Sequence, residues 1–181
     1  MTTTRVLLLP GLHDSGPEHW QSHWERTLQG FRRVRQRDWE TPDRREWVET
    51  LDRAVAEAGP DVVLAGHSTS CALVAFWARE PGRRVRGALL VAPSDTEAPS
   101  YPAGPTGWGP MPLGRLPFPS IVVASDNDEY VTLTRAVQFA RAWGGRLVNI
   151  GAAGHINSTS GLGAWPRGLA LLQELLGHEP N

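Results

Sequence analysis

Residues suited to acyl transfer occur in loops that lie far apart along the chain. Ser68 stands in the segment Gly-His-Ser-Thr-Ser, between the apolar run 62–65 and the helix-like run 71–78. A serine hydroxyl is a weak nucleophile at neutral pH, so it needs a general base and a third group that orients the base. Two later segments, Ser-Asp-Asn-Asp-Glu-Tyr-Val and Gly-His-Ile-Asn, contain carboxylates and then an imidazole. This order of residue types fits a serine nucleophile with a histidine base and an acidic partner.

The sequence around Ser68 fits a sharp turn between a strand and a helix. The two backbones nearly touch in such a turn, so the residues two before and two after the serine must be small. Gly66 and Ser70 are both small, although the usual pattern Gly-x-Ser-x-Gly ends in glycine. The alternative is that Ser68 only caps the helix, a role that serine fills well. That alternative explains neither Gly66 nor the partner loops, so we predict that Ser68 is the nucleophile.

A histidine and an aspartate are the predicted partners of the serine. His155 lies in a glycine-rich loop between the last predicted strand and the final helix, where a base could lean over the turn. The acid must accept the second imidazole N–H and fix the tautomer of the ring. Asp126 and Asp128 both follow the fifth predicted strand. We favour Asp128, because the Tyr-Val pair after it could anchor the loop, and we interpret Asp126 as a turn residue. An acidic surface turn is the alternative for both.

Acyl transfer also needs backbone N–H groups that face the oxygen on which negative charge develops. The residue after the nucleophile, Thr69, is the first predicted donor. The loop after the first strand, Leu-Pro-Gly-Leu-His-Asp-Ser-Gly-Pro, should supply the second. Leu12 is our first choice there and His13 the second. A phosphate-binding loop is excluded, because the chain has neither Gly-x-Gly-x-x-Gly nor any lysine.

Neither a metal nor a cofactor is predicted. His19 and His23 are four residues apart on a predicted helix, but no Glu completes the His-Glu-x-x-His pattern and no third ligand is evident. The proline-rich segment 98–120 lies where a lid would be inserted, and it forms either a pocket wall or a solvated loop. The predicted substrate-binding residues are His13, Trp20, Tyr101, Trp108, Ile156 and Asn157.

Short β-type runs alternate with helical patterns along the chain, which predicts an α/β fold of one domain over residues 1–181. Four of the runs are continuously apolar, as expected for parallel strands covered on both faces. The charged, alternating run 31–37 is predicted as an edge strand. The predicted strands cover residues 5–10, 31–37, 61–66, 85–92, 120–125 and 146–151, and the predicted helices cover 16–30, 41–59, 71–78, 132–145 and 164–177.

The amino-acid composition limits the classes of partner that the protein is expected to bind. The 18 basic and 19 acidic residues give a formal charge of -1. The protein therefore has no excess positive charge that would attract it to nucleic acid or to an anionic membrane. A small-molecule substrate fits better. The single cysteine, Cys71, cannot form an intrachain disulfide, and no apolar run is long enough for a signal-peptide core or a spanning helix. We therefore expect a cytoplasmic protein, and the oligomeric state stays open.

Four segments together resemble a known family: "LLLPGLHDSGPEHW", "LAGHSTSCALVAFWA", "ASDNDEYV" and "GAAGHINSTSGLGAWPRG". They are similar to the small serine hydrolases related to retinoblastoma-binding protein 9, within the α/β-hydrolase superfamily. The resemblance runs over almost the whole chain and departs from the usual pattern at Ser70. It implies a minimal α/β-hydrolase fold with strand order 2-1-3-4-5-6 and no large lid domain. It also implies that Ser68, Asp128 and His155 are nucleophile, acid and base.

The function predicted from these observations is hydrolysis of small, mostly uncharged carboxylic esters through an acyl-serine intermediate. Two alternatives remain open within the same fold. One is a thioesterase or peptidase, and the other is a catalytically silent binding protein.

Overall fold

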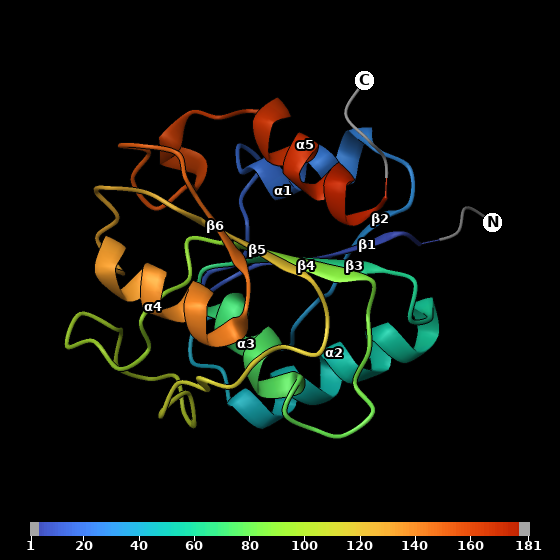
Figure 1. Ribbon diagram of the computed structural model, residues 1–181, viewed down its shortest axis with the longest axis horizontal. Helices are drawn as coiled ribbons and strands as arrows, with labels where there is room; N and C mark the ends of the chain where they lie inside the picture. Colours follow the sequence, from blue (N-terminus) through green and yellow to red (C-terminus); the bar gives the residue numbers. More distant parts are fainter. Residues whose placement is uncertain (1–3, 178–181) are drawn as a thin grey trace.

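A six-stranded, all-parallel sheet with the order β2-β1-β3-β4-β5-β6 forms the centre of the molecule (Figure 1). The computed structural model describes residues 4–177, so the first three and last four residues of the predicted domain lie outside the described residues. The predicted α/β-hydrolase strand order is confirmed. The strands are β1 (Val6–Leu9), β2 (Phe31–Arg33), β3 (Val63–His67), β4 (Gly87–Val91), β5 (Ser120–Ala124) and β6 (Arg146–Asn149).

Helices cover both faces of the sheet, as predicted. Helices α1 and α5 lie on one face, and α2, α3 and α4 lie on the other (Figure 1). The helices are α1 (Trp20–Thr27), α2 (Arg44–Ala58), α3 (Thr69–Trp77), α4 (Leu133–Trp143) and α5 (Pro166–Leu175), with a short 3-10 helix η1 (Ser158–Ser160).

Alternation along the strands explains the two layers. Successive side chains of a strand point to opposite faces of the sheet. Leu7 and Leu9 of β1 pack into the cluster that includes α2, α3 and α4, whereas Val6 and Leu8 pack into the cluster with α1 and α5. All four are essentially inaccessible. A continuously apolar strand is therefore required, because both of its faces are covered.

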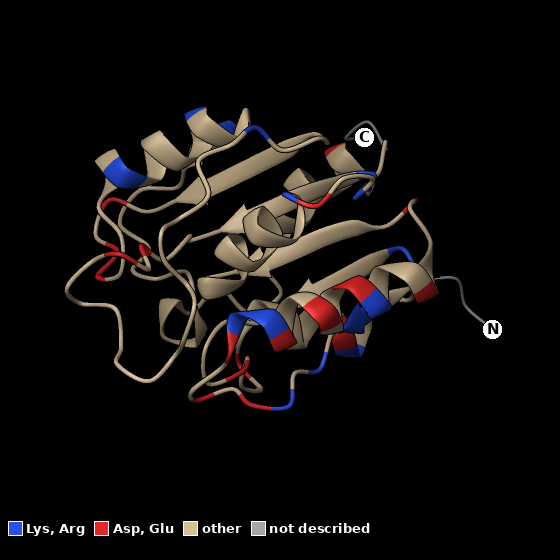
Figure 2. Ribbon diagram, turned by 90° about the horizontal axis from the view of Figure 1, so that it is seen from below, with Lys and Arg blue, Asp and Glu red and all other residues tan. Residues whose placement is uncertain are grey.

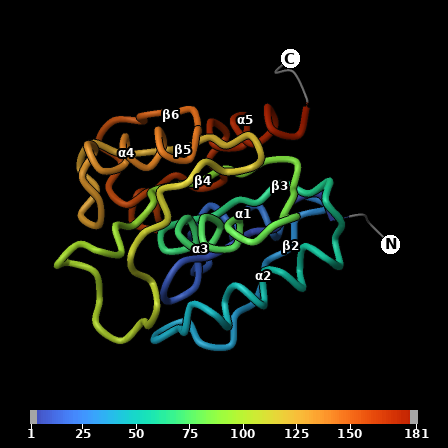
Figure 3. The backbone as a smooth tube through the Cα atoms, turned by 60° about the horizontal axis from the view of Figure 1, so that its bottom comes forward, coloured from blue at the N-terminus to red at the C-terminus, as the bar shows by residue number. Residues whose placement is uncertain are grey.

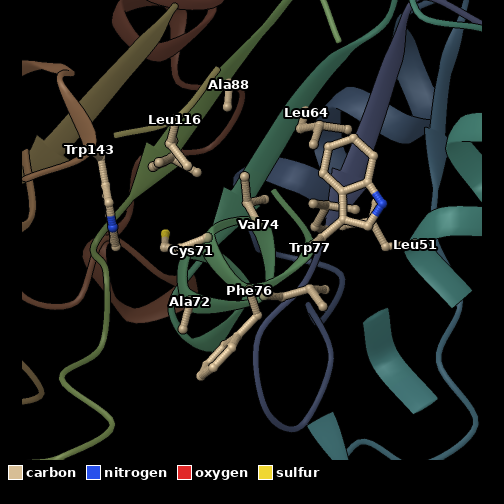
Figure 4. Packing of buried hydrophobic residues seen from close by; sticks show 14 of the residues in the cluster. Leu51, Leu64, Cys71, Ala72, Val74, Phe76, Trp77, Ala88, Leu116 and Trp143 are labelled. Carbon is tan, nitrogen blue, oxygen red and sulfur yellow. The ribbon is translucent and has the colours of Figure 1, made fainter. Parts of the chain in front are cut away.

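Helix α3 is the most buried helix of the fold. Every residue from Thr69 to Trp77 is buried, because the helix is covered both by the sheet and by its neighbouring helices. Figure 4 shows side chains of α3, among them Val74 and Trp77, meeting Leu51 of α2 and Leu64 of β3. The helix that follows Ser68 is thus held rigidly against the sheet.

The two edge strands are short. The predicted strand 31–37 is paired with β1 only over Phe31–Arg33. Arg37 beyond it is exposed and pairs with Glu46 of α2 at 2.6 Å. The charged residues after Arg33 therefore leave the sheet for the surface, which explains the overestimated length.

Helix α1 begins later than predicted. The predicted helix begins at residue 16, but the observed helix starts at Trp20 with His19 as its N-cap. The residues before it form a loop in which His13 and Asp14 both adopt positive φ values, 66° and 62°. Two consecutive left-handed residues turn the chain sharply, so the helix cannot begin until the loop is complete.

The segment between β4 and β5 contains neither helix nor strand and forms a long loop beside the α/β layers (Figure 3). It is partly anchored in the core: Trp108 is buried against Trp47 and Phe76. Helix α2 carries both acidic and basic residues (Figure 2). No helix described between residues 4 and 177 is long and apolar enough to cross a bilayer.

Truncating a core leucine of α5 tests the packing on the face of the sheet that α1 and α5 cover. Leu172 is fully buried against the sheet, so Leu172→Ala should lower the free energy of unfolding by about 2–4 kcal/mol. Leu113 is 45% exposed, so Leu113→Ala should change it by less than about 0.5 kcal/mol. Urea unfolding measures both. Equal effects of the two substitutions would contradict the described packing.

Candidate active site

The predicted chemistry-bearing loops meet at the carboxyl ends of the strands, where open parallel sheets bind their ligands. A cavity of about 240 Å³ opens there. Its wall combines residues from five separate segments of the chain. The lining residues are Leu12, His13, Asp14, His19, His67, Ser68, Thr69, Ser94, Tyr101, Pro102, Tyr130, His155, Asn157, Ser158 and Thr159.

Ser68 occupies a strained turn between β3 and α3. Its backbone angles are φ 59° and ψ -127°, a conformation that costs a non-glycine residue on the order of 1–3 kcal/mol. The turn is held because the Ser68 N–H donates to the Val91 carbonyl at 3.0 Å. A Cβ atom on Gly66 would lie 3.2 Å from the Ser70 carbonyl oxygen. The small residue at that position therefore permits the close approach of strand and helix.

Ser70, which stands where the usual pattern has glycine, has a contact of its own. It is 1% exposed, and its hydroxyl donates to the Pro10 carbonyl at 2.5 Å. This hydrogen bond joins the turn at Ser68 to the loop after β1. The departure from glycine thus adds a link between two segments of the site.

The structure brings Ser68, His155 and Asp128 together. His155 Nε2 lies 2.9 Å from Ser68 Oγ, and His155 Nδ1 lies 2.9 Å from each oxygen of Asp128. The side chain of His155 is 6% exposed and that of Asp128 is 0% exposed. Because a carboxylate only accepts hydrogen bonds, the Nδ1 atom of the neutral ring carries the proton and Nε2 accepts from the Ser68 hydroxyl.

The loop of His155 is fixed from several sides. His67 Nε2 donates to the His155 carbonyl at 2.9 Å, and the indole N–H of Trp20 donates to the next carbonyl, that of Ile156, at 3.0 Å. Ile156 adopts φ 49°, which is unusual for a β-branched residue. These contacts hold the imidazole over the turn at Ser68.

The two candidate aspartates have different surroundings. Asp128 faces His155 and also accepts a hydrogen bond from the Tyr130 N–H at 2.9 Å. Asp126 is exposed and accepts from Asn149 Nδ2 at 2.6 Å. Of the two, only Asp128 contacts the imidazole.

The two candidate oxyanion donors in the loop after β1 differ in whether the N–H is already bonded within the protein. The His13 N–H is bonded to the Trp39 carbonyl at 2.9 Å, which removes our second choice for an oxyanion donor. Leu12 lines the cavity, and within residues 4–177 its N–H has no protein acceptor. Thr69, the first residue of α3, also lines the cavity, and the N–H of a first helical residue has no partner within its own helix.

Arg33 of β2 anchors the loop after β1. Its side chain is 6% exposed, and it donates to Asp14 Oδ1 at 2.6 Å and to the Ser15 carbonyl at 2.9 Å. Gly11 lets the loop pass close to Ser68: a Cβ atom at residue 11 would lie 2.7 Å from Ser68 Cβ and 3.1 Å from Ser68 Oγ. The absence of a side chain at residue 11 is therefore a condition for the geometry.

Two buried histidines close to His155 are held uncharged. Burial, with the nearby Arg33 and His155, lowers the pKa of His19 to about 3. Burial, with His19 and His155, holds the pKa of His67 well below its usual range. His19 Nδ1 accepts from the Gln21 N–H at 3.2 Å and so caps α1. In the described part of the chain, no group of three His, Cys, Asp or Glu side chains is arranged to hold a metal ion.

The predicted substrate-binding residues divide into two groups. His13, Tyr101 and Asn157 line the cavity. Burial raises the pKa of Tyr101 to about 12, and its hydroxyl lies 3.2 Å from Thr69 Oγ1. The other three predicted residues do not line the cavity, because their side chains are buried in the core. They are Trp20, Trp108 and Ile156.

Ser94 also lines the cavity, although it was not among the predicted residues. Its Oγ atom lies 2.8 Å from Ser68 Oγ. The residue follows the carboxyl end of β4 in the segment Ala-Pro-Ser-Asp, so its position after a predicted parallel strand was the available signal.

The family model described as Serine hydrolase matches residues 6–174. The chain belongs to the serine hydrolase family. The crystal structure of a YdeN-like hydrolase from Pectobacterium atrosepticum is 35% identical in sequence, with a TM-score of 0.84 over 97% of this chain and 91% of that chain. None of the curated proteins matches this chain. The relation to retinoblastoma-binding protein 9 stays a prediction.

Two more distant structures share the fold of this serine hydrolase family member. The ydeN gene product from B. subtilis is 16% identical, with a TM-score of 0.79 over 97% of this chain and all 100% of that chain. MGS-M2, an α/β hydrolase from a Medee basin deep-sea metagenome library, is 12% identical, with a TM-score of 0.71 over 99% of this chain and 91% of that chain.

Adding one methyl group at residue 11 tests how closely the loop passes Ser68. Gly11→Ala should reduce the hydrolase activity by roughly 100-fold, because the loop must move away from Ser68. Gly16 lies in the same loop, and a Cβ atom there would meet nothing within 4 Å, so Gly16→Ala should retain wild-type activity. Hydrolysis of p-nitrophenyl acetate measures both. Full activity of the Gly11 variant would refute the close approach.

Acidification tests the buried imidazoles. The pKa of His19 is about 3 in the folded chain against an ordinary value of 6.5, so the unfolded chain binds more protons between these pH values. The free energy of unfolding should therefore be fully retained above the ordinary value and fall as the pH drops towards the lower one. Urea unfolding across this interval measures the loss. His19→Asn keeps a capping oxygen and should show a weaker loss, whereas an unchanged pH dependence would speak against the role of His19.

Proposed function

We propose that this serine hydrolase cleaves small, mostly uncharged carboxylic esters through an acyl-serine intermediate. Ser68 is the proposed nucleophile, His155 the general base and Asp128 the residue that orients the base. The observation that carries the proposal is the continuous hydrogen-bonded row from Asp128 through His155 to Ser68, with distances of 2.9 Å at each junction. The alternative that Ser68 is only a helix cap is not favoured, because its side chain makes no capping hydrogen bond to α3.

In the proposed acylation step, Ser68 Oγ attacks the carbonyl carbon while its proton passes to His155 Nε2. The imidazolium that forms is stabilised by the buried carboxylate of Asp128. The N–H groups of Leu12 and Thr69 are the proposed donors to the oxyanion, which they stabilise most as charge develops in the transition state. His155 then gives the proton to the leaving alcohol, and the acyl group stays on Ser68.

In the proposed deacylation step, His155 removes a proton from water as the water attacks the acyl-serine. The carboxylic acid is released and the proton returns to Ser68 Oγ, so the enzyme regains its initial state. Asp128 keeps the same contact with the ring in both halves. The uncharged, buried His19 and His67 add no positive charge beside the imidazole in the resting site.

The cavity supports a small, uncharged substrate. No arginine lines it among residues 4–177, and the chain has no lysine. The one carboxylate among its described lining residues, that of Asp14, is paired with Arg33 at 2.6 Å. A charged substrate group would find no opposite charge, whereas an ester needs only the oxyanion donors and hydrogen bonds from His13, Tyr101 or Asn157.

Covalent labelling tests the proposed nucleophile. A fluorophosphonate probe should label the wild-type protein at Ser68, and Ser68→Ala should abolish labelling and ester hydrolysis, because the attacking oxygen is removed. Mass spectrometry of the labelled peptide locates the adduct. Folded wild-type protein that resists the probe would favour the alternative of a silent binding protein. A panel of esters, thioesters and peptides separates the remaining alternatives.

A matched pair of substitutions tests the proposed acid. Asp128→Asn should lower kcat by about 10⁴-fold, because the amide no longer holds the imidazole in the required tautomer. Asp126→Asn alters an exposed residue two positions away that bonds to Asn149, and it should leave kcat close to the wild-type value. Steady-state hydrolysis of p-nitrophenyl acetate distinguishes them. A larger loss in the Asp126 variant would reverse the assignment.

A further inference from the structure

Ser94 makes a direct contact with the reacting atom of the proposed nucleophile. Its Oγ atom lies 2.8 Å from Ser68 Oγ, and the residue is 3% exposed. Within residues 4–177, Ser68 is the one protein hydrogen-bond partner of the Ser94 hydroxyl. A buried hydroxyl with a single partner is costly unless that hydrogen bond is made. The hydroxyl is therefore committed to the nucleophile.

The direction of this hydrogen bond follows from the other contacts of the site. Asp128 accepts from His155 Nδ1, so Nε2 of the neutral ring has a free lone pair. The single proton of Ser68 points to that lone pair at 2.9 Å. Ser68 Oγ can then only accept from Ser94. The result is a directed chain in which Ser94 donates to Ser68, Ser68 to His155 and His155 to Asp128.

The backbone holds Ser94 firmly at this place. Ala92 adopts φ 49°, and its N–H donates to the Val123 carbonyl at 2.8 Å. On the other side, the Asp95 carboxylate accepts from Arg135 Nε at 3.0 Å. A positive φ is unfavourable for alanine, so the surrounding contacts must enforce this turn. The turn directs Ser94 towards Ser68.

We propose that Ser94 is a further catalytic residue, which donates a hydrogen bond to Ser68 Oγ while bonds form and break at that atom. This inference rests on the proposed function. During acylation the O–H bond of Ser68 breaks, its proton moves to His155, and a bond forms between Oγ and the carbonyl carbon. Ser94 keeps its own proton throughout. During deacylation the same donor stabilises Oγ as it leaves the carbon and regains its proton from His155.

The contribution of Ser94 should be greatest in the transition state. The negative charge on Oγ is larger while its proton is being transferred than in the resting hydroxyl or in the acyl-serine, whose ester oxygen is a poor acceptor. A donor to this atom therefore acts on the rate of reaction and little on the binding of substrate. Ser94 thus differs from a residue that only shapes the cavity, whose loss would change KM.

Removing one hydroxyl tests the inference. Ser94→Ala should lower the rate constant of fluorophosphonate reaction and the kcat for p-nitrophenyl acetate by roughly 5–10-fold, with KM unchanged, because one neutral hydrogen bond is lost. Ser120→Ala is the matched control. Ser120, the first residue of β5, is also a buried serine, but its hydroxyl has no partner in the described residues. This control should react at the wild-type rate, and thermal unfolding should show that both variants are folded.

Each outcome separates the inference from the function on which it rests. Slow reaction of the Ser94 variant with unchanged KM supports the inference. Wild-type rates in that variant, with an active wild type and an inert Ser68→Ala, overturn the role of Ser94 and leave the proposed function intact. A rise in KM at unchanged kcat also overturns it in favour of a pocket wall. An inert wild type overturns the proposed function and the inference together.

Discussion

The hydrogen bond between Ser68 Oγ and His155 Nε2 is the contact on which the rest of the site depends. It joins residues 87 positions apart in sequence. On each side of this hydrogen bond, the backbone adopts an unfavourable conformation. Ser68 has φ 59°, and Ile156 beside the histidine has φ 49°. Such strain persists only where surrounding structure determines it. Here the fully buried α3 fixes one side, and hydrogen bonds from His67 and Trp20 fix the other.

The parallel sheet explains why residues from such distant segments can meet. Parallel strands place all their carboxyl ends at one edge, so the loops after β1, β3, β4, β5 and β6 each contribute to one cavity. Links between these loops then set their positions. Ser70 bonds to the loop after β1, and Asn127 Oδ1 accepts from the Gly154 N–H at 2.8 Å. The site is therefore a network of loops, each fixed by its neighbours.

The sequence predicted the fold well because burial on both faces leaves a strong pattern. Apolar runs without alternation marked the central strands, and the predicted strand order is confirmed. Loop order likewise pointed to Ser68 and His155, which the structure brings together. The choice between Asp126 and Asp128 depended on loop shape, which the sequence suggests only through the apolar residues that follow.

The cavity wall was less predictable, because it depends on where tertiary packing places each side chain. Trp20 and Trp108 were expected in the wall, but their indole N–H groups bond to the carbonyls of Ile156 and Pro42 inside the fold. No sequence pattern reveals such partners. Ser94 shows the opposite case, since an ordinary Ala-Pro-Ser-Asp segment places a hydroxyl against that of Ser68.

A crystal structure of the protein after reaction with a phosphonate ester would decide whether Ser68 is the nucleophile of this site. We expect continuous density from the oxygen of Ser68 to phosphorus, with the phosphoryl oxygen within hydrogen-bonding distance of the backbone N–H groups of Leu12 and Thr69. We also expect the imidazole of His155 to keep its contact with Asp128. An adduct on another side chain, or a phosphoryl oxygen directed away from both N–H groups, would contradict the proposed mechanism.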